Sequence, residues 1–319
     1  MGYKEIGTLA LTPFEYMRDF ARMIKWSKAS PFCPEAIKLK YEILLLAHTV
    51  EKGLSSFKPR PKFGFSKISA LLGWLSSYKS DWDRFPLEKS YGCLLAYVKW
   101  HDEIGVEIGP IRKEIENFFD RCQVLGVVPK GGVKVLDVSN LAPNPVAQQF
   151  LLSRFSSRRY ADVIIPSELI DGIVAIARRA PSQCNRQSVR LHYYARPEQI
   201  DALLKLQGGA EEFRASVKNL FVVTSEISGW SGYKARSQAY VDGALVAMQV
   251  LNACQALGFA ACPLNLAISN RREGEICLVG NISQGERLIL MIAFGYPLPG
   301  DVVAARSERI SEEVLLSRH

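Results

Sequence analysis

The feature that most constrains the fold is a long uncharged helix that lies between two buried strands. Residues 238–257 read as one helix and carry a single charged residue, Asp242. A helix that is apolar nearly all round has to be buried, either in a large core or against a partner subunit. The runs Leu220–Thr224 and Leu288–Phe294 are continuously apolar, which is typical of strands buried on both faces. This half of the chain is therefore predicted to be α+β, a sheet wrapped by helices.

Two further elements complete the predicted second half. A helix is expected to begin at Pro166-Ser167, because Glu168 and Asp171 then lie in its first turn and suit the helix dipole. Apolar and polar residues alternate over Val189–Tyr194, and this period of two predicts a half-buried strand.

The first 125 residues are predicted to be helical. Thr12–Glu15 has the pattern of a capping box with proline at the first helical position, so a helix is expected to start there. The apolar spacing predicts four more helices, over residues 36–52, 66–78, 87–103 and 110–122. The first of these is expected to end at Gly53, which would be its C-cap. Glycine and proline pairs between residues 126 and 145 mark a boundary. We therefore predict an all-α domain over residues 1–140 and an α+β domain over residues 146–319.

Composition narrows the function classes. The seven cysteines are an odd number without a C-x-x-C pair, which argues against a disulfide framework or a zinc site and fits a reducing cytoplasm. No uncharged apolar run approaches the ~18 residues of a membrane-spanning helix, and the N-terminus lacks the layout of a signal peptide. The net charge of +8 could attract a nucleotide phosphate, an anionic glycan or a membrane surface, although a solvated basic surface is the more common case. We expect a cytoplasmic protein without a membrane span, a metal site or a nucleic-acid partner.

Three clusters carry residues suited to one chemistry. Residues 153–160 offer arginines and serines, and arginine grips a phosphate in two places at once. Residues 180–187 form a turn rich in side-chain amides, which can donate to and accept from a planar polar ring. Residues 257–263 contain Gly258 and Pro263 without charge, and such a backbone can approach a flat ligand closely. Together the clusters suit a phosphorylated cofactor that bears a ring.

The order of these motifs resembles the nitroreductase family of flavin oxidoreductases over some 165 residues, about half of the chain. The family typically shows R-R-S-x-R-x-F, A-P-S-x-x-N-x-Q-P, L-G-L-G-x-x-P and a G-Y-P strand end, in that order. This chain shows Ser153–Tyr160, Ala180–Gln187, Leu257–Pro263 and Gly295–Pro297 in the same order, with Tyr240–Ala244 opening the uncharged helix. The resemblance implies a sheet wrapped by helices that binds FMN.

The family's phosphate-binding positions can be carried over residue by residue. Arg154, Ser156 and Arg158 fall on the first basic motif, which implies contacts with the FMN phosphate and ribityl chain. Arg306 and Arg309 are the candidates for the C-terminal basic residues that also reach the phosphate. This chain departs from the pattern in the first motif, where Phe155 replaces the usual arginine or histidine.

The positions that face the flavin are carried over in the same way. The amide turn, which implies contacts with the flavin ring and the ribityl chain, corresponds to Pro181, Ser182, Asn185 and Gln187. Ser188 replaces the proline that commonly follows this turn. The shelf beside the flavin N5, where the family donates a backbone N–H, corresponds to Pro263, Leu264 and Asn265. Such a donor stabilises the reduced flavin, so the protein would tune the cofactor.

The resemblance implies an FMN-dependent oxidoreductase that transfers hydride from NAD(P)H to an unidentified small-molecule substrate. The flavin carries the hydride in this family, so no catalytic residue is assigned to the chain. The resemblance also implies a homodimer with FMN at the subunit interface, and the uncharged helix over residues 238–257 suits that interface.

Two alternatives stay open. Phe155 and Ser188 would fit a flavin-binding protein that has lost its redox activity. The extra helical domain would fit a specialised relative, such as a reductive dehalogenase, a dehydrogenase of peptide heterocycles or a flavin-cleaving enzyme. The segment His48–Leu54 also resembles one in nitroreductase-like proteins linked to surface polysaccharide synthesis, although a helical cap that narrows access to the site is the simpler reading.

Overall fold

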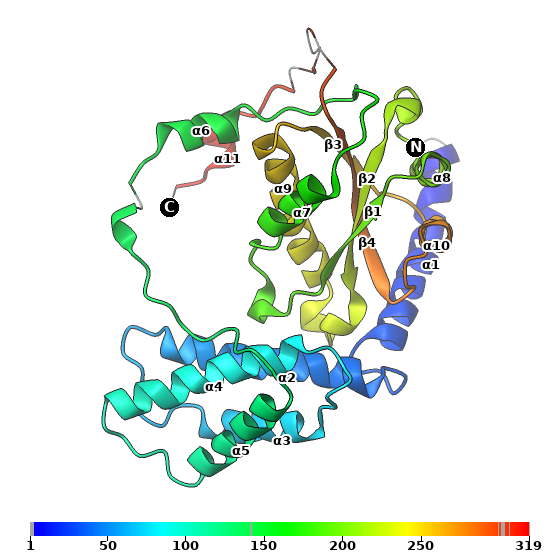
Figure 1. The fold of residues 1–319 in the computed structure, drawn as a ribbon. Coiled ribbons are helices and arrows are strands. Elements are labelled where there is room, and N and C mark those ends of the chain that lie inside the picture. Colours follow the sequence, from blue (N-terminus) through cyan, green and yellow to red (C-terminus); the bar gives the residue numbers. More distant parts are fainter. Residues whose placement is uncertain (1–2, 141, 299, 301–303, 306, 319) are drawn as a thin grey trace.

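The structure has a helical part and a part built around a β-sheet (Figure 1). It is a computed structural model, and it describes residues 3–140, 142–298, 300, 304–305 and 307–318. The predicted α+β class is confirmed, since one antiparallel sheet is wrapped by helices and a group of helices precedes it.

Four helices form the helical part around a single apolar core. They are α2 (Glu35–Leu54), α3 (Phe65–Ser77), α4 (Phe85–Glu103) and α5 (Ile111–Val124). All four were predicted to within about two residues at each end, but α2 passes through Gly53 and has Ser55 as its C-cap. The buried apolar residues of this core come from residues 39–127.

A glycine on α4 allows a loop to pass directly over this helix. A Cβ atom added to Gly92 would lie 2.5 Å from the carbonyl oxygen of Lys130 and 2.6 Å from its carbonyl carbon. The loop is held there because the Lys130 N–H donates to the Glu88 carbonyl at 2.8 Å. Gly92 is therefore the point at which the chain leaving the helical part is docked onto α4.

We expect Gly92→Ala to lower the free energy of unfolding by about 1–3 kcal/mol, the usual cost of overpacking. Urea unfolding followed by circular dichroism measures the change. Gly73→Ala on α3 is the matched control, because nothing lies within 4 Å of its added Cβ. That control should be neutral or up to about 1 kcal/mol stabilising through helix propensity. Equal stability of the two variants would contradict the docked loop.

The prediction that the first helix starts at Pro13 is wrong. Helix α1 spans Tyr3–Trp26 and contains Pro13 in its interior, at the cost of a backbone hydrogen bond. The Glu15 side chain does not cap the helix, because its carboxylate accepts hydrogen bonds from the backbone and side-chain N–H groups of Asn270 at 2.7 and 2.8 Å. A residue with capping-box spacing is thus used for a tertiary contact.

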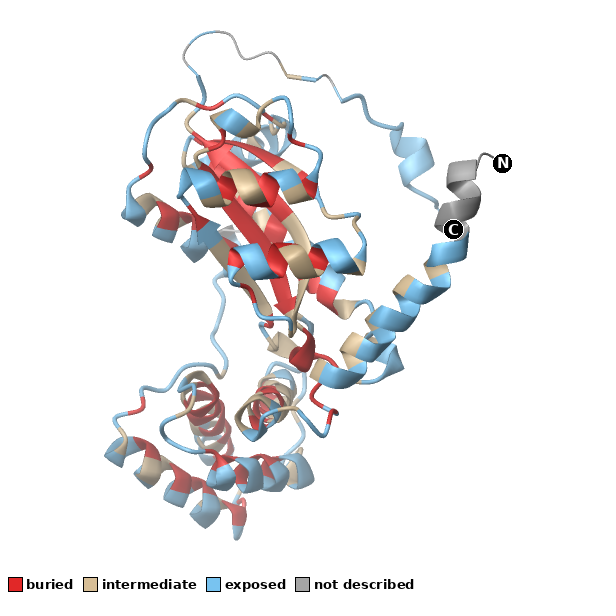
Figure 2. Ribbon diagram, turned by 90° about the vertical axis from the view of Figure 1, so that its right-hand side faces the viewer, coloured by how far each residue is buried: buried red, intermediate tan, exposed pale blue. Residues whose placement is uncertain are grey.

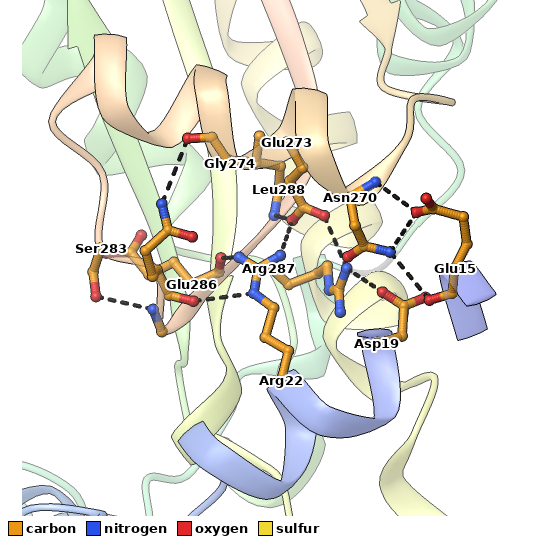
Figure 3. A network of polar contacts seen from close by, with 12 residues as sticks. Glu15, Asp19, Arg22, Asn270, Glu273, Gly274, Ser283, Glu286, Arg287 and Leu288 are labelled. Atoms are coloured by element: carbon orange, nitrogen blue, oxygen red, sulfur yellow. Dashed lines mark hydrogen bonds and ion pairs between the residues drawn. The ribbon is translucent and has the colours of Figure 1, made fainter. Parts of the chain in front are cut away.

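Helix α1 docks on the sheet part through charged side chains (Figure 3). Arg22 pairs with Glu273 at 2.7 Å, and Arg287 bridges Asp19 and Glu273 at 2.9 Å each. Glu273 lies on α10 (Asn270–Gly280), and Arg287 lies near the start of β4 (Glu286–Gly295). The first helix of the chain therefore packs against elements from its last third.

The sheet has four antiparallel strands in the order β1-β2-β4-β3. The other strands are β1 (Val189–Tyr194), β2 (Asn219–Glu226) and β3 (Ala260–Asn265). The two continuous apolar runs of the sequence form the inner strands β2 and β4, as their burial on both faces requires. β3 is an edge strand, so one of its backbone edges is open to other groups.

Helices cover both faces of the sheet. One apolar core joins α7 (Ser167–Ala177) and α9 (Gln238–Ala256) to residues of β2 and β4, and a second joins α8 (Pro197–Gln207) and α10 to their other face. The short helices α6 (Pro145–Leu152) and α11 (Glu312–Leu315) have no buried residues. Figure 2 shows the buried sheet between its covering helices. Within the part of the chain that the structure describes, no helix has the length and apolar character needed to cross a membrane.

Candidate functional site

The first basic motif runs beside the open edge of β3. The Ser157 N–H donates to the Ala261 carbonyl at 3.1 Å, which fixes this segment against the strand. Arg154 lines a cavity of about 200 Å³ together with Phe155, Gln255 and several apolar residues. Its Nη1 atom is buried and has no hydrogen-bond partner among the described residues. A buried donor of this kind needs an acceptor, and an anionic oxygen is the strongest one for a guanidinium.

Arg158 approaches the same part of β3 as Arg154. Burial raises the pKa of the Cys262 thiol, and the positive charges of both arginines act in the opposite direction. Ser156, between them, is half-buried, and Arg158 is exposed. The first motif therefore lies beside β3, with Arg154 and Arg158 both close enough to Cys262 to act on its thiol. Phe155 is part of the cavity wall, so the departure from the family pattern makes that wall more apolar.

The amide turn is anchored by a buried carboxylate at the start of α9. Asp242 is 1% exposed and accepts hydrogen bonds from the Ser182 hydroxyl at 2.7 Å and the Gln183 N–H at 3.1 Å. The Gln187 N–H in turn donates to the Ser182 hydroxyl oxygen at 2.9 Å. The sequence motif contained Asp242 without assigning it a role. The sequence feature that could have revealed this role is that Asp242 is the one charged residue in an otherwise uncharged helix.

Three residues of the amide turn adopt the left-handed backbone conformation although none of them is glycine. Cys184, Asn185 and Gln187 have φ values of 52°, 51° and 54°. Each such residue costs roughly 1–2 kcal/mol, less for asparagine, so the surrounding contacts must impose the shape. The Gln187 side-chain amide donates to the Asn185 side-chain oxygen at 2.9 Å, and Pro181 and Gln187 are exposed. The turn is a rigid, solvent-facing array of amide groups.

The shelf residues lie on β3, and their backbone alternates in direction. The Ala261 carbonyl accepts a hydrogen bond from Ser157, which lies outside the sheet. Because successive residues of a strand direct their backbone groups to opposite sides, Ala261, Pro263 and Asn265 all direct theirs to the open edge of β3. The Gln207 side chain donates to the Asn265 carbonyl at 3.0 Å, which agrees with this assignment. Proline has no N–H, so of the three predicted shelf residues Asn265 is the one with an outward donor. Leu264 points its side chain into the core.

The structure does not bring the basic motif and the amide turn of one chain together. The amide turn is bonded to Asp242 near the start of α9, whereas the Arg154 cavity contains Leu251 and Gln255 near its end. Nine residues of helix separate Asp242 from Leu251, which corresponds to roughly 13 Å along the helix axis. In the C-terminal tail, Arg309 is exposed and donates to the Ser307 carbonyl. Arg306 lies outside the described residues.

Helix α9 is covered by the sheet and by α7. Gly243 faces β4 so closely that an added Cβ would lie 2.6 Å from Ile289 Cγ1. On the other side, a stripe at helical spacing is between 40 and 48% exposed, and it consists of Tyr240, Val241, Leu245 and Met248. The sheet of one chain thus leaves an apolar face of α9 open, with the amide turn at one end and the Arg154 cavity at the other.

Solved structures similar to this chain include three flavin-related proteins. An FMN-dependent nitroreductase from Clostridium difficile is 18% identical, with 53% of this chain and 98% of that chain covered, at a TM-score of 0.45. The NADPH:FMN oxidoreductase from Vibrio harveyi is 16% identical, with 54% and 76% covered, at a TM-score of 0.44. The NfrA1 nitroreductase from B. subtilis is 17% identical, with 53% and 72% covered, at a TM-score of 0.47.

Comparison of the sequence itself gives one match to a protein family. No curated protein matches the chain. Residues 151–224 match the sequence model of the Nitroreductase family, and this segment contains both the basic motif and the amide turn. The chain therefore contains a segment that matches the Nitroreductase family, and a helical part precedes this segment.

Proposed function

We propose that the protein is an FMN-dependent oxidoreductase that passes hydride from NAD(P)H to a small-molecule substrate. The observation that carries the proposal is the buried Arg154 Nη1, which has no hydrogen-bond partner in the described part of the chain and lies in a cavity at the open edge of β3. A phosphate oxygen is the acceptor that this donor lacks. When bound, FMN would supply the hydride chemistry, and the residues of the chain bind and orient it. The match of residues 151–224 to the Nitroreductase family supports this assignment.

Each set of residues has a distinct part in holding the cofactor. Arg154, Ser156 and Arg158 would bind the phosphate and the adjoining ribityl chain, with Arg306 and Arg309 as further candidates from the tail. The side-chain amides of the turn would contact the flavin ring and ribityl. The outward N–H of Asn265 is the donor available to the flavin N5, and a donor there favours the reduced flavin.

We further propose that the site is completed in a homodimer. The exposed stripe of α9 would pack against the same stripe of a second copy, as a two-fold axis requires of a shared patch. If the two helices run antiparallel, the amide turn of one copy lies beside the Arg154 cavity of the other. This arrangement explains why the basic motif and the amide turn of one chain lie apart along α9: each would form a site with the other motif of the second copy.

A second exposed apolar face supports a large contact between copies. Helix α1 turns its charged side to the sheet part, while four large residues at helical spacing, each at least 55% exposed, face away: Phe14, Met17, Phe20 and Ile24. Large apolar residues that are exposed together on one helix face often mark a contact with another protein.

The proposal predicts that the purified protein is yellow and releases about one FMN per chain on denaturation, because each chain has one Arg154 cavity for the phosphate. Anaerobic addition of NADPH should bleach the flavin absorbance. Colourless protein that fails to take up added FMN would refute the cofactor assignment. Bound flavin that neither NADPH nor NADH reduces would instead identify a flavin-binding protein without redox activity.

A further inference from the structure

Helix α2 of the helical part lies close to the amide turn and carries a buried tyrosine. Helix α2 lies against the turn at residues 183–185, and Tyr41 on α2 is fully buried. Its hydroxyl donates to Oε2 of Glu226, the last residue of β2. The packing around it is tight, because a Cβ added to Gly229 would lie 3.3 Å from the Tyr41 ring and 2.8 Å from Ser188 Cβ.

Glu226 is connected to the amide turn through Arg190. Its second oxygen, Oε1, pairs with Nη2 of Arg190 at 2.6 Å. Nη1 of the same guanidinium donates to the carbonyl oxygen of Gln187 at 2.9 Å. A continuous series of hydrogen bonds therefore joins Tyr41 in the helical part to the backbone of the amide turn.

The direction of each bond in this series is fixed. Burial and the neighbouring Glu226 carboxylate raise the pKa of Tyr41, so its hydroxyl stays protonated and acts as the donor. Arg190 donates at both ends because a guanidinium has no acceptor. Gln187 is one of the left-handed residues of the turn, so its conformation depends on contacts of this kind.

We infer that Tyr41 is a positioning residue for the cofactor, which fixes the amide turn through Glu226 and Arg190 and so makes the helical part a component of the flavin site. The inference rests on the proposed function, in which the amide turn contacts the flavin. It gives the helical part a role that the family resemblance does not assign to it.

Tyr41→Phe tests the inference, because it removes only the hydroxyl. We expect FMN affinity, measured by quenching of flavin fluorescence, to fall about five- to tenfold. This is less than the roughly 10- to 150-fold worth of a direct hydrogen bond to a charged group, because Tyr41 acts on the turn through Glu226 and Arg190. Tyr97→Phe is the matched control, since Tyr97 is also fully buried and donates to the Phe63 carbonyl at 3.0 Å inside the helical core. The control should lower the melting temperature without changing FMN affinity. Equal FMN affinities of the two variants would overturn the inference.

Two further measurements separate this inference from the proposed function. Hydrogen exchange of residues 182–190 in FMN-free protein should be faster in Tyr41→Phe than in Tyr97→Phe, and unchanged exchange would overturn the inference whether or not FMN binds. If exchange is faster but the wild type binds no FMN, the positioning role stands and the proposed cofactor falls. Combining Tyr41→Phe with Arg190→Lys should weaken FMN binding less than the product of the single effects, because both act through one series of bonds. Independent effects would contradict the series.

Discussion

Arg154→Ala is expected to weaken FMN binding by roughly 10- to 150-fold, which corresponds to about 1.5–3 kcal/mol for a hydrogen bond to a charged group. The physical reason is the buried Nη1 atom that has no partner within the described chain. A phosphate oxygen would satisfy this donor, and alanine offers nothing in its place. Isothermal titration of the FMN-free protein with FMN measures the loss directly.

The stability of the protein should change in a characteristic way in the same variant. FMN that binds only the folded state raises the melting temperature, so Arg154→Ala should lose much of this increase. Without FMN the variant should be about as stable as the wild type, because no hydrogen bond of Nη1 is removed. Arg159→Ala, an exposed arginine of the same segment, is the control and should leave FMN affinity unchanged. Wild-type affinity in Arg154→Ala would show that the first motif is placed in the wrong register.

Ala244→Asp is expected to convert the dimer into a monomer or an aggregate that holds no flavin. Ala244 is exposed on α9 beside Val241 and Leu245, within the stripe proposed to pack against a second copy. An unpaired carboxylate buried in that contact costs several kcal/mol. Because the proposed site draws on both copies, dimer and cofactor should be lost together. Light scattering and the flavin absorbance of the same sample measure the two losses.

Ala70→Asp is the matched control for this change. Ala70 is exposed on α3 in the helical part, so the same substitution there should leave the dimer and its flavin intact. A wild-type protein that is monomeric and still holds FMN at low concentration would refute the interfacial site. A dimeric Ala244→Asp with full flavin content would place the contact elsewhere than on α9.

The elements that could be predicted without the structure are those with a local pattern in the sequence. The apolar spacing gave helices α2 to α5 and α9 close to their observed limits, and the continuous runs identified the inner strands β2 and β4. Helical and strand periods can be read within a window of about 11–18 residues, so these predictions need no knowledge of distant contacts. The order of the motifs also pointed to the nitroreductase family, and residues 151–224 match the model of that family.

Only the tertiary structure decided how these elements meet. It showed that α1 continues through Pro13 because its charged side docks on α10 and β4, and that Asp242 anchors the amide turn. It separated the Arg154 cavity from that turn along α9, and it joined Tyr41 to Glu226 over 185 positions of sequence. Such contacts depend on which faces of two distant elements pack together, and the spacing of residues within one element carries no information about its partner. For this reason the candidate site residues could be identified from the sequence, while their distribution over one chain required the fold.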